Sequence, residues 1–153
     1  MLINDPVYGR QKIDSKVLIE LIKSVPVQRL KKIAQFAIPD KYYFVKNITR
    51  FEHSVGVMLL LRKLGASEKE QIAGLLHDVS HTAFSHLIDW VIGNAGGDES
   101  YQDERHKSFI KSNALAKILK KYSYKPQEIF EYKHFGLLEE SFLCFVQTEW
   151  IIL

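Results

Sequence analysis

Apolar residues recur at helical spacing along much of this chain, and the helix starts are clearest in residues 49 to 89. Thr49 with Glu52, and Ser67 with Glu70, both show the S/T-x-x-E spacing of a capping box. In such a box each side chain satisfies a free backbone amide of the other residue at a helix start. Two helices are therefore predicted to begin at these positions.

Three consecutive helices are expected in this stretch. The first ends at Gly65 and contains an apolar stripe that we assign to the core: Val55, Val57, Leu59, Leu60 and Leu61. The second contains Ile72, Leu75 and Leu76 and ends at His77 and Asp78. The third is expected to begin near Thr82 or Ala83 and to continue to Ile92. Four of the six histidines fall at the ends or first turns of these helices, where ligands from separate elements can converge, so we predict a metal site.

The residues before this stretch predict two further helices. Residues 1 to 13 are typical of an extended or hairpin-like segment, and Asp14 or Ser15 is expected to cap a short helix. Pro26 suits the first turn of the next helix. That helix is expected to end at Pro39-Asp40, to bury Val27, Leu30, Ile33 and Ala34, and to show Arg29, Lys31 and Lys32 on one side. Residues 41 to 48 predict either a short strand or an extended loop.

The residues after it predict a polar loop and two more helices. Residues 93 to 104 form the loop, one helix runs from about Asp103 to Lys121, and Pro126 begins a short one. Residues 135 to 153 are strongly apolar. The chain is therefore expected to be an all-α bundle of about six to eight helices with minor strand content, in a single domain over residues 1–153.

Composition and charge narrow the class of protein. The hydrophobic content of 46% and charged content of 25% are globular values. Cys144 is the only cysteine, and the first residues, MLINDPVYGR, contain no apolar signal core, so we expect a cytoplasmic protein without membrane segments. Residues 1 to 63 contain 12 Lys and Arg against 5 Asp and Glu. With no run of five like charges, this balance favours a small anionic substrate such as a phosphate ester over specific nucleic-acid binding.

His53, His77 and Asp78 supply the imidazole and carboxylate ligands that hydrolytic divalent metals prefer. A His-Asp dipeptide alone is a weak signal, because it occurs by chance in many chains. Here it lies within LLHDVSHTAFSH and follows RFEHS by 24 residues, which makes the signal specific.

The chain resembles the HD-domain metal-dependent phosphohydrolases, most closely the deoxynucleoside triphosphate triphosphohydrolase branch. The similar segments are DPVYG, PVQRLKKIAQF, TRFEHSVG and LLHDVSHTAFSH, and the similarity extends over roughly residues 3 to 120. The resemblance implies that His53, His77 and Asp78 are three ligands of one divalent ion, which could be Mn, Fe, Ni, Mg or Zn.

The resemblance also implies roles around that ion. His81 would face the substrate phosphates as a general acid or phosphate donor, and His106 would belong to the same pocket. His81 lies four residues after His77, so on a continued helix both would share one face. Arg50 would contact a substrate phosphate, and its planar guanidinium suits that contact. Gln35 would contact the sugar, and His86 would line the pocket. Asp89 would orient a histidine.

One part of the family pattern is missing from the sequence. The family has a fourth ligand, an Asp in a motif similar to D-x-D-x-x-D-Y, and no such motif follows His106. The chain is either naturally short or a truncated or frameshifted form. Asp98, Asp103, Glu139 or Glu140 are possible substitutes, and no spacing argument favours one of them.

Three functions remain open from the sequence. The first is hydrolysis of a (deoxy)nucleoside triphosphate. The second keeps the site but takes a nucleoside monophosphate or a cyclic nucleotide, and the third is a catalytically weak regulatory domain that binds metal or nucleotide. The family resemblance and the apolar residues 137 to 153 also predict a homo-oligomer.

Overall fold

The fold is described from a computed structural model for residues 1–35, 48–82, 101–112 and 114–138. Its strands are β1 (Leu2–Asp5) and β2 (Gly9–Lys12), an antiparallel pair in which Leu2 lies opposite Lys12. Its α-helices are α1 (Lys16–Lys23), α2 (Val25–Arg29), α3 (Arg50–Lys63), α4 (Glu68–Leu76), α6 (Tyr101–Ser112), α7 (Ala114–Lys121) and α8 (Pro126–Phe130). Two 3₁₀ helices, η1 (Leu30–Lys32) and η3 (Tyr132–His134), complete the described elements. The predicted all-α class with minor strand content is confirmed.

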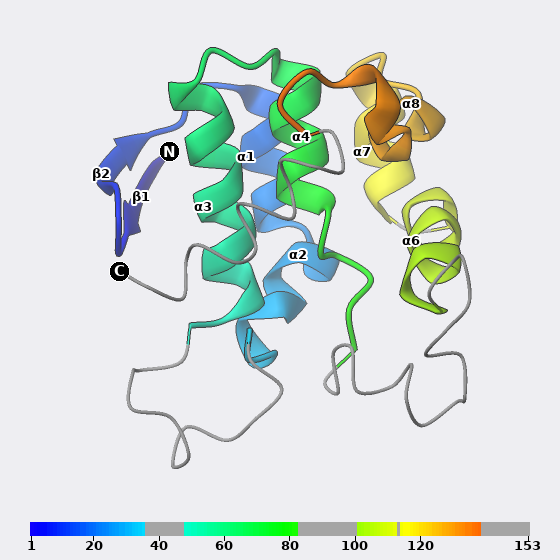
Figure 1. Ribbon diagram of the computed structural model, residues 1–153, viewed down its shortest axis with the longest axis horizontal. Helices are drawn as coiled ribbons and strands as arrows, with labels where there is room; N and C mark the ends of the chain where they lie inside the picture. Colours follow the sequence, from blue (N-terminus) through cyan, green and yellow to red (C-terminus); the bar gives the residue numbers. More distant parts are fainter. Residues whose placement is uncertain (36–47, 83–100, 113, 139–153) are drawn as a thin grey trace.

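Helices α3 and α4 lie side by side at the centre of the bundle (Figure 1). The β1–β2 hairpin lies beyond α3 on one side, and α6, α7 and α8 lie beyond α4 on the other. Helix α1 packs behind the central pair and contacts α7. Residues from the two ends of the described sequence therefore enclose the helix that contains His53 and the helix that ends just before His77.

The core is continuous from the first helix to the last described residues. Its fully buried side chains come from nearly every element and include Leu18, Leu21, Leu30, Met58, Leu59, Ile72, Leu75, Leu76, Ile110, Leu115 and Leu119. The apolar stripe predicted in residues 55 to 61 is buried, with Leu60 half-buried against the core. Burial of each such side chain stabilises the fold by about 1.5–3 kcal/mol.

The helix starts agree closely with the capping pattern. At α3 both bonds of the box are present, because the Thr49 hydroxyl accepts from the Glu52 amide and the Glu52 carboxylate accepts from the Thr49 amide. At α4 the Ser67 hydroxyl accepts from the Glu70 amide, as predicted. The buried Glu70 carboxylate differs: its Oε1 accepts from the amides of Leu137 and Leu138, at 2.7 and 3.1 Å. The Glu70 carboxylate thus bonds to residues far along the chain and not to the backbone at the start of its own helix.

The helix predicted to run from Pro26 to Pro39 is wrong beyond its first turns. Helix α2 ends at Arg29, η1 follows, and Ile33 is extended. Ala34, expected in the core, is exposed and forms an antiparallel bridge with Thr49. The Gln35 amide donates to the Ile48 carbonyl at 2.8 Å. Pairing with the residues that precede α3 therefore replaces the helical hydrogen bonds here.

The predicted single helix from Asp103 to Lys121 is two helices, α6 and α7, and α6 begins at Tyr101 inside the predicted polar loop. Helix α6 ends at Ser112, and α7 begins at Ala114. The hairpin, the Ser15 cap of α1 and the start of α8 at Pro126 are confirmed. The third predicted helix of the central stretch and most of residues 135–153 lie outside the described residues.

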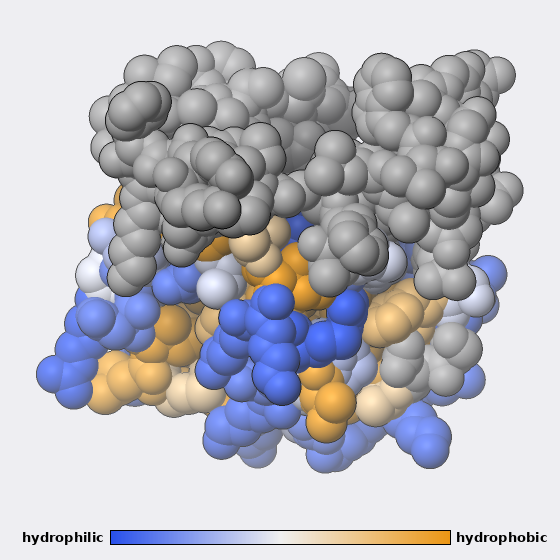
Figure 2. Space-filling view, turned by 90° about the horizontal axis from the view of Figure 1, so that it is seen from below, coloured by the Kyte–Doolittle hydropathy of each residue, from blue (hydrophilic) through white to orange (hydrophobic). Residues whose placement is uncertain are grey.

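The described surface mixes charged and apolar side chains. In Figure 2 the coloured part of the surface shows hydrophilic residues with apolar areas between them. Within the described ranges, every helix is too short or too polar to cross a lipid bilayer.

Gly74 is a point of close approach between α4 and α3. A Cβ at this position would lie 2.3 Å from Leu61 Cδ1 and 3.2 Å from Val57 Cγ1. We expect Gly74→Ala to destabilise the protein by about 1–2 kcal/mol, because overpacking outweighs the helix propensity that alanine adds. Thermal unfolding measures the change. Gly136→Ala is the control, because no atom lies within 4 Å of its new Cβ; an equal or smaller loss for Gly74→Ala would contradict the close approach.

Candidate metal centre

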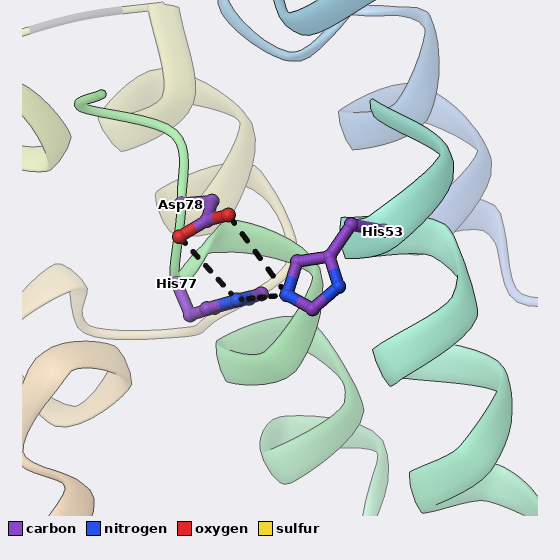
Figure 3. Close-up of side chains that lie close together, drawn as sticks. All are labelled: His53, His77 and Asp78. Carbon is purple, nitrogen blue, oxygen red and sulfur yellow. Dashed lines mark hydrogen bonds and ion pairs between the residues drawn. The ribbon is translucent and has the colours of Figure 1, made fainter. Parts of the chain in front are cut away.

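Two helices bring the three predicted ligands together. His53 lies in the first turn of α3, one turn after the Thr49 cap. His77 is the C-cap residue of α4, and Asp78 follows it in the turn that leaves the helix. Their ligand atoms all lie within 4.8 Å of one another, and Figure 3 shows the three side chains pointing toward one another. The end of α4, not a shared helix face, allows adjacent residues to meet at one point.

The hydrogen bond of His77 determines which of its nitrogens faces the cluster. His77 Nδ1 lies 2.7 Å from the Gly74 carbonyl oxygen, which only accepts, so Nδ1 is the donor. In the neutral ring the lone pair is then on Nε2, which lies 3.2 Å from His53 Nε2. A backbone carbonyl that orients the second nitrogen is a common feature of histidines that ligate metals.

Burial keeps His53 in the protonation state that a metal requires. Desolvation, with a smaller contribution from neighbouring His77, lowers the pKa of His53 to about 4, although Asp78 opposes this shift. His53 is therefore neutral near pH 7, so its ring nitrogen can act as a ligand.

Asp78 is ionised although it is buried. Burial alone would raise the pKa of its carboxyl, but His77, the hydrogen bond from His81 and the Arg50 guanidinium outweigh burial and hold the pKa well below its usual range. Oδ2 is 2.5 Å from Arg50 Nη1, and Oδ1 is 3.4 Å from His77 Nε2 and 3.1 Å from His81 Nε2. Two imidazoles and one carboxylate fit a divalent transition metal.

Comparison with known proteins identifies the family. The family model described as the HD domain matches residues 50–143. The chain belongs to the HD-domain family. The family expected from TRFEHSVG and LLHDVSHTAFSH, that of the HD-superfamily hydrolases, is thereby confirmed. The match begins at Arg50, the first residue of α3, and includes all three candidate ligands.

Three relatives show the range of similarity. The uncharacterized protein YdhJ of Bacillus subtilis (strain 168) is 45% identical over 99% of this chain and 47% of its own length. The metal-dependent phosphohydrolase cns2 of Cordyceps militaris is 39% identical over 91% of the chain and 40% of its own length. The deoxynucleoside triphosphate triphosphohydrolase SAMHD1 of Mus musculus is 31% identical over 83% of the chain and 22% of its own length. The chain thus spans less than half of each of these HD relatives.

His81 is near the candidate metal centre, although not for the reason predicted. Helix α4 ends at Leu76, so His81 is not on a continuation of it. The turn after the helix instead folds back and brings His81 Nε2 to 3.1 Å from Asp78 Oδ1.

His106 in α6 joins the same turn from another side. Its Nδ1 lies 3.2 Å from Ser80 Oγ, and its Nε2 lies 3.1 Å from the Tyr132 hydroxyl. His106 is buried, and it contacts Ser80, the residue that precedes His81.

Arg50 is the first residue of α3, and Gln35 lies beside it. Arg50 is buried, and its Nη2 is 3.4 Å from the Gln35 carbonyl oxygen. Gln35 Oε1 is buried with no hydrogen-bond partner in the described part of the chain, as is Thr82 Oγ1. His86 and Asp89 lie outside the described residues, as do Asp98, Glu139 and Glu140. His134 is exposed, with 73% of its side chain accessible.

The sequence did not point to four residues that organise the centre. They are Arg29, Gly74, Ser80 and Tyr132. Arg29 was expected on a polar helix face, but its Nη2 donates to the carbonyl oxygens of Val79 and His81. Its place in PVQRLKKIAQF, one of the segments similar to the HD family, was the only available signal.

Proposed function

We propose that this chain is the HD part of a metal-dependent phosphohydrolase that acts on a nucleotide, with a deoxynucleoside triphosphate as the expected substrate. The observation that supports this most directly is the cluster of His53, His77 and Asp78 in a chain of the HD-domain family. Relatives named as a metal-dependent phosphohydrolase and as a deoxynucleoside triphosphate triphosphohydrolase support the chemistry and the substrate class.

His53 and His77 would hold the ion through Nε2, and Asp78 through a carboxylate oxygen. A divalent ion held there supplies Lewis-acid polarisation of a phosphoryl oxygen and a more acidic water. The identity of the ion is open among Mn, Fe, Ni, Mg and Zn. With only three protein ligands from this cluster, the donor set is one that leaves room for water and substrate.

The surrounding residues would act on the substrate. Arg50 presents a guanidinium that can neutralise a phosphate oxygen, and it lies at the N-terminal turn of α3. His81 would donate a proton to the leaving oxygen or hydrogen-bond a phosphate, because its ring lies beside Asp78. The unpartnered Gln35 Oε1 is a buried acceptor that a sugar hydroxyl would satisfy. His106, and His86 by family resemblance, are proposed to complete the pocket.

A product-resolved assay tests this function. The full chain, loaded in turn with Mn²⁺, Mg²⁺, Ni²⁺, Fe²⁺ and Zn²⁺, is incubated with deoxynucleoside triphosphates, nucleoside monophosphates and cyclic nucleotides. We expect chromatography to show a deoxynucleoside and inorganic triphosphate, and saturating EDTA to abolish both. Release of phosphate from monophosphates or cyclic nucleotides alone would change the substrate, and turnover in EDTA would contradict the metal mechanism.

We also propose that residues 1–153 form one domain and that the protein is a cytoplasmic homo-oligomer. The apolar character of residues 137 to 153 supports association, and within the described residues Leu138 already packs against the protein's own core.

A further inference from the structure

The residues Val79, Ser80 and His81 form a short turn directly after Asp78, here called the site turn. Its own amides bond locally: Val79 N donates to the Leu76 carbonyl and His81 N to the Asp78 carbonyl, both at 3.0 Å. These bonds close the turn on the end of α4. They do not determine how the turn is placed against the rest of the protein.

Arg29 makes the contact that places the site turn. Its Nη2 donates to the carbonyl oxygens of Val79 and His81, each at 2.9 Å, although these residues are 50 and 52 positions away in the sequence. Both hydrogens of one guanidinium amino group are thereby used on a single turn. Hydrogen bonds from a charged donor are about twice as strong as neutral ones, so this contact is strong for its size.

Arg29 is itself held in position by two elements. It is the last residue of α2, which is anchored by the fully buried Val27 and followed by the fully buried Leu30. Its guanidinium carbon lies 5.6 Å from the centre of the Phe109 ring in α6, a cation–π distance. Arg29 therefore connects α2, the site turn and α6.

The side chains of the site turn complete the geometry. Ser80 Oγ contacts His106 Nδ1 at 3.2 Å, so the middle residue is held from α6. The next residue, His81, places its Nε2 3.1 Å from Asp78 Oδ1. The carbonyls of Val79 and His81 are held by Arg29, and the Ser80 hydroxyl is held by His106. These contacts direct the His81 ring to the metal centre.

We propose that Arg29 is a positioning residue of this HD site, which holds the site turn by its two carbonyls and so fixes the His81 imidazole beside Asp78. The inference rests on the proposed function for its kinetic consequence. Arg29 acts only through His81, so it changes the rate of the chemical step and leaves the three metal ligands in place.

A purely structural role for Arg29 makes a different prediction. If Arg29 only stabilises the bundle, its removal lowers the unfolding temperature and increases exchange throughout the core. If it positions the site turn, its removal loosens that turn at temperatures where the protein is fully folded. The two roles are therefore separated below the unfolding transition.

The experiment uses the full chain with Arg29→Met, Arg29→Lys and the control Arg62→Met. Arg62 Nη1 also donates to a backbone carbonyl, that of Lys12 at 2.9 Å, but at the far end of α3. Amide hydrogen exchange is followed at Val79 and His81 in metal-free protein. We expect exchange about tenfold faster or more in Arg29→Met, the equivalent of one lost charged hydrogen bond, with partial recovery in Arg29→Lys and no change in the control.

The kinetic measurement follows in the presence of saturating Mn²⁺. We expect kcat to fall about tenfold or more in Arg29→Met while KM and the Mn²⁺ content stay within about threefold of wild type. Arg29→Lys should recover part of kcat, because an ammonium can still donate to both carbonyls.

Unchanged exchange at Val79 and His81 in Arg29→Met would overturn the proposal, as would an equal increase across the core. Faster exchange with unchanged kcat would overturn the link to His81. If the wild-type chain hydrolyses no phosphate ester, the proposed function fails, and the exchange data alone still decide whether Arg29 holds the site turn.

Discussion

Replacing His77 with alanine is expected to remove metal binding from this protein. His77 Nε2 faces His53 Nε2 at 3.2 Å and Asp78 Oδ1 at 3.4 Å, so its ring lies close to both other residues of the cluster. Loss of a group that only orients a ligand typically costs about 10- to 100-fold in metal affinity, so loss of a ligand should cost at least about 100-fold. Elemental analysis of protein prepared without chelator measures the metal content, with up to one ion per wild-type chain and almost none in His77→Ala.

Thermal unfolding gives a second readout of the same prediction. At a free ion concentration of about 100 times Kd, binding stabilises the folded state by about 2.7 kcal/mol. For a chain of this size each kcal/mol shifts Tm by about 2–4 °C, so Mn²⁺ should raise the wild-type Tm clearly and leave His77→Ala unchanged. His134→Ala is the control, because that ring is exposed. A wild-type Mn²⁺ shift in His77→Ala would show that the ion is held elsewhere.

The local features of the fold were predictable where a short sequence pattern decides them. The Thr49 capping box, the Ser15 cap and Pro26 and Pro126 in first turns each act within about one helical turn, and each is present. The helix from Pro26 failed because its continuation is decided by a partner more than ten residues away. Ala34 pairs with Thr49, and an apolar periodicity does not reveal such a bridge.

The metal cluster was predictable for a related reason. His53 lies one turn after the Thr49 cap of α3, and His77 lies at the end of the helix that Ser67 caps, so the elements that present them could be predicted before their packing was known. What could not be predicted was the support of the cluster. The Gly74 carbonyl that orients His77 is a backbone atom, which no residue type reports.

His81 and Arg29 show the limit most clearly. The spacing of His81 from His77 suggested a shared helix face, but the helix ends before both of them, and a turn brings His81 to Asp78. Arg29 had the pattern of an exposed residue beside Lys31 and Lys32, both of which are exposed. Its contacts with Val79 and His81 exist only because the fold brings the last residue of α2 to the turn that follows α4.

Arg50→Ala is expected to show two separate effects, because Arg50 faces both Asp78 and the proposed substrate pocket. Arg50 and Asp78 are buried, and their 2.5 Å ion pair neutralises a carboxylate in the protein interior. Removing one partner of a buried pair commonly costs about 3–5 kcal/mol, because the other charge stays buried without compensation. In EDTA the Tm of Arg50→Ala should therefore fall well below that of wild type.

A bound divalent ion changes the first effect and not the second. The ion supplies Asp78 with positive charge, so saturating Mn²⁺ should restore much of the lost stability and leave the metal content of Arg50→Ala unchanged. The substrate phosphate still lacks its guanidinium, and loss of one such charge-stabilising donor costs on the order of 10²-fold in kcat/KM. Arg50→Lys should recover stability better than rate, since a lysine keeps the charge without the planar pair of donors.

The arginine control is Arg62→Ala, an exposed residue that contacts Lys12, and it should match wild type in both measurements. Full recovery of kcat/KM in Arg50→Ala at saturating Mn²⁺ would assign Arg50 to the support of Asp78 alone and remove it from substrate binding.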